Sequence, residues 1–450
     1  MAFGKTFVSL VGLILVLLHG KVFALGLLDS YHLALDNDPA FQSAIQEHKA
    51  GQQNRALGRA ALLPRVVYSY NRGRSWSDVT QARTNAPDFE ESRKYDSYAS
   101  TLSLQQPLFD YEAWSRYRKS VAQSLLADEQ FRSQSQALLI RVLEAYTGAL
   151  LAKDQIEMAQ AQMRAYQEQF KLNQRQFEKG NGTKTDSLET QARFHLAQAQ
   201  AIEARDNQDS ALRELQRLVG VPLEITDLEP LAEKFQLLPL SPSNYNAWRD
   251  LAIAGNPELA ALRQSVEVAR HEVERNRAGF LPRLGLYAST GKTKSGSENT
   301  YNQRYDTDSV GIQLSVPLFS GGETLAATRQ ASHLMQKSSY DLDDKVLETL
   351  NQVRKAFNLS SSSAAKIKAY GMSVDSARTL VTATRKSIAA GVRVNLDLLS
   401  AEQSLYTALN ELSKAQYDYL SAWARLRFYA GVLSEQDLEL MANNFVESDG

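Results

Sequence analysis

The residue types that most often carry catalysis are scattered in this sequence of 450 residues. The histidines show neither His-x-x-x-His spacing nor a spaced glutamate partner, and they lie at positions 19, 32, 48, 195, 271 and 333. Ser320-Gly321-Gly322 lacks the Lys-Ser/Thr that completes a phosphate-binding loop. Because the chain has no cysteine, disulfides, thiolate metal sites and thiol catalysis are excluded together. We therefore expect neither an enzyme nor a bound cofactor.

Charge and hydropathy restrict the partners. The formal net charge is -1, so there is no basic excess to bind phosphate backbones, and nucleic acid is not an expected partner. The mean hydropathy is -0.36, and outside the extreme N-terminus no run of about 18 apolar residues predicts a helical membrane span. Without cysteine there is also no N-terminal lipid attachment, so any membrane anchoring must come from the fold itself.

The N-terminus has the pattern of a secretory signal. Lys5 supplies a positive charge, the stretch from Phe7 to Leu18 is nearly all apolar, and Val22-Phe23-Ala24 approximates a cleavage site. The alternative is a buried first helix. We expect residues 1–24 to be a signal peptide, with the mature chain starting near Leu25 outside the cytoplasm.

The chain is a tandem duplication, since short motifs recur in the same order at nearly constant offsets. Leu63-Pro64-Arg65 recurs 218 residues later as Leu281-Pro282-Arg283. The other recurring pairs are Asp38-Pro39 with Asn256-Pro257, Pro107-Leu108-Phe109 with Pro317-Leu318-Phe319, Gly180 with Gly391, Asp186 with Asp397, and Gly220-Val221 with Gly431-Val432. We expect repeats over 25–230 and 244–450, joined by a proline-bearing linker over 231–243.

Long helices are predicted in each repeat. No proline occurs from 108 to 221 or from 318 to 450, and proline breaks helix interiors at a cost of about 3 kcal/mol. Both stretches are rich in Ala, Gln, Glu, Leu, Lys and Arg, which favour helix. The segments 110–178 and 322–388 would each span roughly 100 Å, and further helix is expected up to 220 and 431.

Between the proline motifs the pattern changes to a period of two. Val310, Ile312, Leu314 and Val316 alternate with small polar residues. Similar strands are expected near 65–76, 95–106, 283–292 and 305–316. For any one segment an ordinary half-buried hairpin is the alternative, but four such segments of about ten residues are typical of transmembrane β-barrel strands. The first half carries eight more residues between its motifs, so the segments 76–91 and 293–301 are expected to be loops facing the cell exterior.

Four strands predict an assembly of several chains. An unpaired backbone group in hydrocarbon costs several kcal/mol, and the smallest single-chain barrels use eight strands. Several chains must therefore share one barrel. The residues alone allow two, three or more chains, provided that the rotation closes.

The motifs together resemble the TolC family of outer-membrane export proteins. The resemblance covers essentially the whole mature chain, including the segment from Gly391 to Asp397 and the stretch from Leu433 to Leu438. It implies a mixed α and β fold: a homotrimer whose twelve strands form one barrel in the outer membrane. It also implies that the long helices form a periplasmic tunnel, an α-barrel, that tapers to a closed tip.

The resemblance also assigns residues at that tip. Asp397 matches the first of two aspartates that line a pore constriction; the second position holds Ser400, and Asn395 is the next candidate within one turn. Arg393 and Asp186 match a tip latch, a linkage that helps to hold the tip closed, in which Ile388 replaces a tyrosine. From the residues alone, Asp186 could equally be a helix N-cap.

The resemblance favours an exit duct for type I protein secretion, with cargo of the protease or lipase class. Its implied partners are a periplasmic adaptor, an inner-membrane ABC transporter or other pump, the exported cargo and outer-membrane lipid. A small-molecule efflux duct is the alternative within the same family. A periplasmic coiled-coil scaffold without a channel would explain the helices but not the strands or the signal.

Overall fold

The computed structural model describes residues 25–82, 84, 87–232, 234–300 and 302–446, so the predicted signal peptide over 1–24 lies outside them. No helix in these ranges is long and apolar enough to cross a membrane. The chain divides into two compact units. The first consists of Met1–Ala44, Gln134–Asn256 and Thr349–Gly450, and the second consists of Ile45–Ser133 and Pro257–Glu348.

The two repeats are not the two compact units. Each unit takes segments from both halves of the sequence. The repeat is one of element order, since each half contains two helices, two strands and two long helices. The first half contains α1 (Leu27–Asn37), α2 (Pro39–Ala60), β1 (Arg65–Gln81), β2 (Phe89–Phe109), α3 (Tyr111–Glu178) and α4 (Lys184–Val219). The second contains α5 (Tyr245–Gly255), α6 (Pro257–Arg277), β3 (Arg283–Lys294), β4 (Arg304–Ser315), α7 (Glu323–Ala389) and α8 (Asn395–Tyr429), and α9 (Glu435–Ala442) follows.

The recurring motifs lie at element borders. Asp38 accepts hydrogen bonds from the backbone amides of Ala40 and Phe41, and Pro39 takes the first helical position, where its missing N–H is not needed. Each Leu-Pro-Arg motif ends where a strand begins, at Arg65 and at Arg283. The repeated prolines therefore lie at or near the borders between elements.

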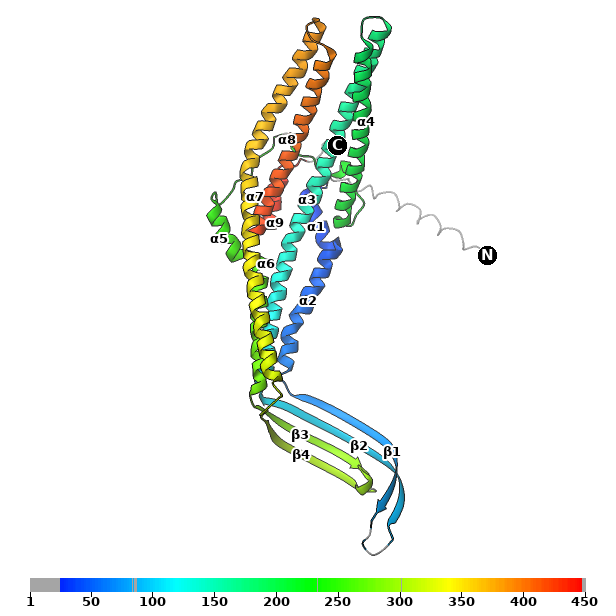
Figure 1. Cartoon of the computed structure of the whole chain (residues 1–450), viewed down its shortest axis with the longest axis vertical. Coiled ribbons are helices and arrows are strands. Elements are labelled where there is room, and N and C mark those ends of the chain that lie inside the picture. Colours follow the sequence, from blue (N-terminus) through cyan, green and yellow to red (C-terminus); the bar gives the residue numbers. More distant parts are fainter. Residues whose placement is uncertain (1–24, 83, 85–86, 233, 301, 447–450) are drawn as a thin grey trace, which may run out of the picture. The chain divides into compact units, whose positions relative to one another are not determined.

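The second unit contains one antiparallel sheet in the order β1-β2-β3-β4 (Figure 1). Its first hairpin is longer than the sequence indicated. The segment expected to be a loop over 76–91 is largely paired, with Trp76 opposite Lys94 and Gln81 opposite Phe89. That expectation was wrong because a ladder satisfies the backbone whatever the side chains are, and the tip carries polar residues in place of the apolar alternation.

The two faces of the sheet differ sharply. We call a set of residues paired across the ladders a row. One row joins Val66, Leu104, Ala288 and Val310, and the next row along joins Val67, Ser103, Ser289 and Ser309 on the opposite face. We call the first side the apolar face; it also carries Tyr68, Tyr70, Leu102, Leu284, Leu286, Ile312 and Leu314. The other face is lined mainly by small polar residues.

Helices α2 and α3 approach closely in the second unit through small residues. A β-carbon added to Gly58 would lie 2.5 Å from the Ser120 side chain, and one added to Gly51 would overlap Ala127. In two antiparallel helices the numbers of facing residues add to a constant. The pairs Gly58–Ser120 and Gly51–Ala127 have the same sum, so both belong to one register. The two glycines lie seven residues apart, so two turns of α2 contact α3 where no larger side chain fits.

The first unit contains two helical hairpins, α3–α4 and α7–α8 (Figure 1). A core formed by residues from α5, α7 and the end of α8 contains Trp248, Ala252, Val353, Ala356, Leu426 and Ala430. The indole of Trp248 donates a hydrogen bond to the carbonyl of Pro242, so the segment that joins the repeats is fixed to this core. The described residues of this linker form no helix or strand apart from the single bridge of Leu231 with Phe445.

The close contact of α2 with α3 predicts the effect of adding one methyl group. Gly58→Ala should lower the free energy of unfolding by about 1–3 kcal/mol, because overlap with Ser120 outweighs the gain in helix propensity. Gly371→Ala in α7 is the control, since a β-carbon there meets nothing within 4 Å, and it should raise stability slightly. Thermal unfolding followed by the helical circular dichroism signal measures both. Equal shifts for the two variants would contradict the packing argument.

Candidate functional site at the tips of the helical hairpins

Both helical hairpins turn through a glycine with a left-handed backbone conformation. Gly180 and Gly391 adopt left-handed φ values of 78° and 73°, which a residue with a β-carbon rarely adopts. Their amides donate hydrogen bonds to the carbonyls of Phe177 and Ile388 at 3.0 and 2.9 Å. The two turns are therefore equivalent in the repeats, and residues at equal distances from them can be compared directly.

The caps of the helices that follow are different. Thr183 caps α4: its hydroxyl accepts a hydrogen bond from the Asp186 amide at 3.1 Å and donates to the Asp186 carboxylate at 2.6 Å. The equivalent cap of α8 is Val394, which has no hydroxyl and makes no side-chain capping bond. The carboxylate of Asp186 is thus used locally. That of Asp397 has no such partner.

Asp397 lies in the first turn of α8 and is half-buried, while Ser400 is exposed three residues further on. The Asp397 amide bonds to the Val394 carbonyl at 3.1 Å, and its carboxylate has no hydrogen bond or ion pair within the described chain. A carboxylate in the first turn is stabilised by the positive end of the helix dipole. The Asp397 carboxylate therefore has the helix start as its described environment, without the side-chain partner that Asp186 has.

Asn395, the third predicted constriction residue, is used inside the chain. Gln169 of α3 donates to its side-chain oxygen at 2.6 Å, and its amide nitrogen donates to the hydroxyl of Thr190 of α4 at 3.3 Å. Thr190 and Asn173 are buried and bonded to each other at 2.8 Å. We call these four residues the polar junction. It connects the tip of α8 to both helices of the other hairpin.

The predicted latch residues are not brought together in one chain. Arg393 is exposed in the turn before α8 and forms no ion pair with Asp186 or any other described residue. Ile388 packs on a cluster formed by Val381, Leu398 and Ala401, so it contributes apolar contact. The ion pair that does join α7 to α8 is Arg385 with the buried carboxylate of Glu402, at 2.7 Å.

Helices α3 and α8 are joined along their length by polar contacts that the sequence did not reveal. Beyond the polar junction, the Gln162 amide donates to the side-chain oxygen of Gln403 at 3.0 Å, and Asp154 accepts from Ser413 at 2.5 Å. The remaining contacts are Tyr166 with Gln403, Tyr417 with Asp154, and Arg425 with Glu144. These residues can be recognised only when it is known that α3 packs against α8, because in the sequence each of them resembles an ordinary polar surface residue.

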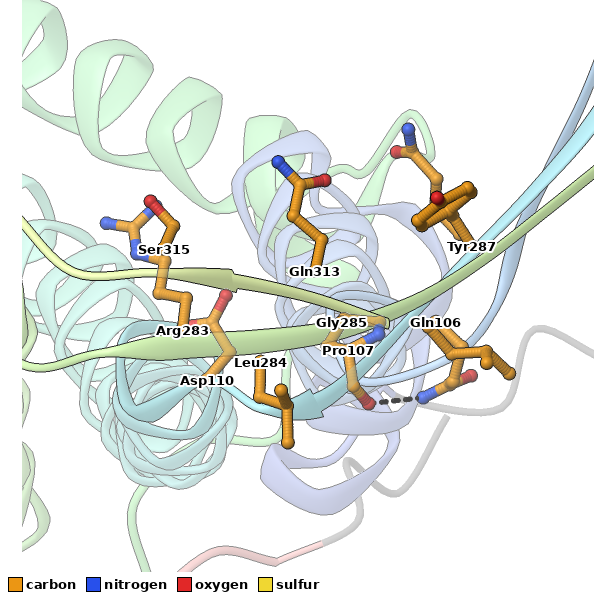
Figure 2. A pocket seen from close by; sticks show the side chains of 11 residues that line it. Gln106, Pro107, Asp110, Arg283, Leu284, Gly285, Tyr287, Gln313 and Ser315 are labelled. Carbon is orange, nitrogen blue, oxygen red and sulfur yellow. Dashed lines mark hydrogen bonds between the residues drawn. The ribbon is translucent and has the colours of Figure 1, made fainter. Parts of the chain in front are cut away.

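A cavity of about 400 Å³ lies at the base of the sheet in the second unit (Figure 2). Its charged groups are used structurally. Arg283 donates to Glu112 at 2.5 Å, and Asp110 caps α3 through the Ala113 amide at 3.0 Å. Within the part of the chain that the structure describes, no three His, Cys, Asp or Glu side chains are grouped to hold a metal ion. Nothing in this cavity forms a catalytic constellation.

The fold is that of outer-membrane channels. A membrane protein from Pseudomonas aeruginosa matches with a TM-score of 0.78 and 19% identity, covering 92% of this chain and 93% of that one. The CmeC outer membrane channel of Campylobacter jejuni matches with a TM-score of 0.78 and 17% identity, covering 93% and 90%. The predicted mixed α and β fold is confirmed at this level.

The family follows from the sequence comparisons. The model described as outer membrane efflux protein matches residues 30–221 and 248–432, and the chain belongs to this family. It is 79% identical to the alkaline protease secretion protein AprF of Pseudomonas aeruginosa, covering 98% of this chain and 91% of AprF. It is 45% identical to the proteases secretion protein PrtF of Dickeya chrysanthemi, covering 96% and 94%, and 29% identical to TolC of Vibrio cholerae, covering 94% of each. The resemblance to the TolC family is confirmed, and the family and fold are those of channels and not of enzymes.

The contact of Asp154 with α8 predicts a pH dependence. Burial raises the pKa of this carboxyl above its ordinary value of 3.8, although the hydroxyls of Ser413 and Tyr417 donate to it and act in the opposite direction. Because the pKa is raised in the folded chain, the stabilising contribution of the protonated form is complete below about pH 3.8. It is lost as the pH rises through the folded value.

Asp154→Asn should therefore be more stable than the native chain at pH 7, and the difference should shrink as the pH falls towards 4. The amide oxygen can still accept from Ser413, so the contact itself is retained. Melting temperatures of both proteins across this range measure the difference, with the exposed Asp375→Asn in α7 as control. A difference that does not change with pH would contradict the explanation.

Proposed function

We propose that this chain is the outer-membrane exit duct of a type I protein secretion apparatus, with a protease-class protein as cargo. The observation that carries the proposal is the 79% identity over nearly the whole chain to an alkaline protease secretion protein. The 45% identity to a second protease secretion protein supports the same cargo class.

The proposed assembly is a homotrimer with one shared barrel of twelve strands. In the described chain, β1 pairs only with β2 and β4 pairs only with β3, so each outer strand has one edge without a partner. In hydrocarbon those edges must be paired, and copies related by a closed rotation can pair β1 of one with β4 of the next. The apolar face then faces lipid and the face rich in serine and threonine faces the lumen. The number three comes from the TolC family.

The proposed partners are a periplasmic adaptor and an inner-membrane ABC transporter. The helices would extend from the barrel into the periplasm, where the hairpin tips would meet these partners. The competing function, a duct for small-molecule efflux, is represented among more distant relatives, such as the outer membrane efflux protein BepC of Brucella suis at 23% identity. The lower identity makes this the second candidate.

A complementation experiment tests the function. A host that has the ABC transporter and adaptor for an alkaline protease, but lacks their outer-membrane component, should release active protease when this chain is supplied. The matched control is a host that also lacks the transporter, in which the chain should restore nothing. Protease trapped in the cells, although the chain is present in the outer membrane, would contradict the proposal. Restored resistance to small toxic compounds without protease release would indicate the efflux alternative.

The tip residues can be tested as a proposed constriction and latch. Because Arg393 and Asp186 are apart within one chain, we place the latch between Arg393 of one chain and Asp186 of a neighbouring copy. One exposed pair contributes only about 0–1 kcal/mol, but three copies can bias a gate by a few kcal/mol. Three copies of Asp397 around a narrow pore would attract cations.

Single-channel recording in planar bilayers separates the two roles. Arg393→Ser should raise conductance by favouring the open tip, while Lys179→Ser, in the turn of the other hairpin, should not. Asp397→Ala should weaken cation selectivity and block by multivalent cations. If the conductance and the selectivity both stay at native values, these side chains are solvated groups, and the constriction is built by others.

A further inference from the structure

A row of basic side chains crosses the apolar face at the level of the β3–β4 turn. In this row Arg72 pairs with Tyr98, Tyr98 pairs with Lys294, and Lys294 pairs with Arg304. Arg72 and Arg304 are exposed, and Lys294 is half-exposed. We call these four residues the basic row. It holds three cations and a phenol on one side of the sheet.

The pairing of Lys294 with Arg304 is unfavourable by itself. They are the last pair of the β3–β4 ladder, and strands in a ladder lie about 4.8 Å apart. Like charges directly opposite each other destabilise a sheet. No cation of the basic row forms an ion pair with another described side chain. Asp96 acts electrostatically on Arg72 and Lys294, but its carboxylate is bonded to Arg74. A further anion beside Lys294 and Arg304 would therefore be stabilising.

Two of the three nearby carboxylates are engaged with other cations. Asp96, two rows beyond the basic row and on the same face, accepts from Arg74 at 2.6 Å, and Asp306, two rows nearer the base, lies 3.8 Å from Lys292. Asp308 lies two rows further towards the base, opposite Thr290. The basic row therefore keeps its surplus of positive charge.

The turn that carries Lys294 and Arg304 is held by its own hydrogen bonds. The Ser295 amide donates to the Gln303 carbonyl at 2.9 Å, and the Asn302 amide donates to the Ser295 hydroxyl at 3.1 Å. Ser295 and Asn302 take φ values of 50° and 61°, so both ends of the turn are specifically shaped. The backbone positions of the two cations are thereby held opposite each other at the end of the ladder.

The position of the basic row along the strands matches the depth of a membrane. Leu284 and Lys294 are ten residues apart on β3, which is about 34 Å along the strand. With a tilt of about 40°, this corresponds to about 26 Å of depth, close to the apolar band of about 25 Å in outer-membrane barrels. The upper part of this span is polar on the same face, where Lys292 is paired with Asp306 and Thr290 with Asp308, so the basic row lies just above the end of the apolar rows. Tyr70 and Tyr98 lie at the boundary, where aromatic side chains concentrate. The basic row thus lies at the level of lipid headgroups.

We propose that the basic row binds the phosphate groups of a phosphorylated glycolipid in the membrane leaflet that faces the cell exterior. This inference rests on the proposed function, since it requires the apolar face to face lipid. Lys294 and Arg304 together contact one phosphate, Arg72 contacts a second, and the acyl chains lie along the apolar rows that begin at Tyr68 and Leu102. Arginine and lysine form charge-assisted hydrogen bonds with phosphate, and the arginine fork can bind it bidentately.

The test measures lipid bound to the assembled protein. Purified protein is incubated with diphosphorylated lipid A or with its dephosphorylated form, and bound lipid is counted by native mass spectrometry. The native chain should prefer the diphosphorylated form, and Lys294→Gln with Arg304→Gln should reduce its binding on the order of tenfold. The control is Lys179→Gln with Lys184→Gln, which removes two cations outside the sheet and should leave binding unchanged.

A second variant separates lipid binding from folding. Arg304→Glu converts the opposed cations into a cross-strand ion pair, so the hairpin should be at least as stable while binding of the phosphorylated lipid is lost. Equal binding of both lipid forms by a chain that inserts and conducts would overturn the lipid site alone. If the native chain does not insert into vesicles of phosphatidylcholine and lipid A, the proposed function and the lipid site both fall.

Discussion

The structure depends on one constraint, which is that backbone N–H and C=O groups at the edges of a sheet need partners. The described sheet has two edges without them, along 17 residues of β1 and 12 residues of β4. In water such edges are solvated, whereas in hydrocarbon each unpaired group costs several kcal/mol. Side chains such as Val310, Ile312 and Leu314 are nevertheless mostly exposed. An apolar, exposed and unclosed sheet is consistent with a membrane protein that is complete only with its copies.

The helices are not subject to this constraint, because their backbone groups are hydrogen-bonded within each helix. How the helices pack is decided by their side chains. Helices α2 and α3 pack through small residues, and Gly51 and Gly58 allow their close approach. Helices α3 and α8 are joined by hydrogen bonds between polar side chains, from the polar junction to the pair of Arg425 with Glu144. A contact of the second kind can be exchanged for water at modest cost, which suits a hairpin that must move if the tip opens.

Much of this architecture can be predicted from the sequence, because period, proline and glycine carry direct physical consequences. The strands β3 and β4 coincide within two residues with segments where apolar and small polar residues alternate, and α3 and α7 lie within one residue of the helices predicted over 110–178 and 322–388. The extension of the first hairpin could not be predicted, because residues such as Ser75 and Asp78 pair through their backbones and show no apolar alternation. At the tips, the sequence indicated that Asp186 and Asp397 are equivalent. It did not indicate that Thr183 engages the first while Val394 leaves the second without a cap, because that difference appears only once the helix starts are fixed.

The central claim, that copies of the chain close the sheet edges, can be tested by cross-linking, because the chain has no cysteine of its own. One cysteine is introduced at Ser309 on β4, and a second is moved along β1 from Val67 to Asn71 in otherwise native protein. At one register, oxidation of the assembled protein in outer membranes should give covalent dimers and trimers and nothing larger. The account is contradicted if no register gives a covalent oligomer although the protein is inserted, or if cross-linking continues into species larger than trimers.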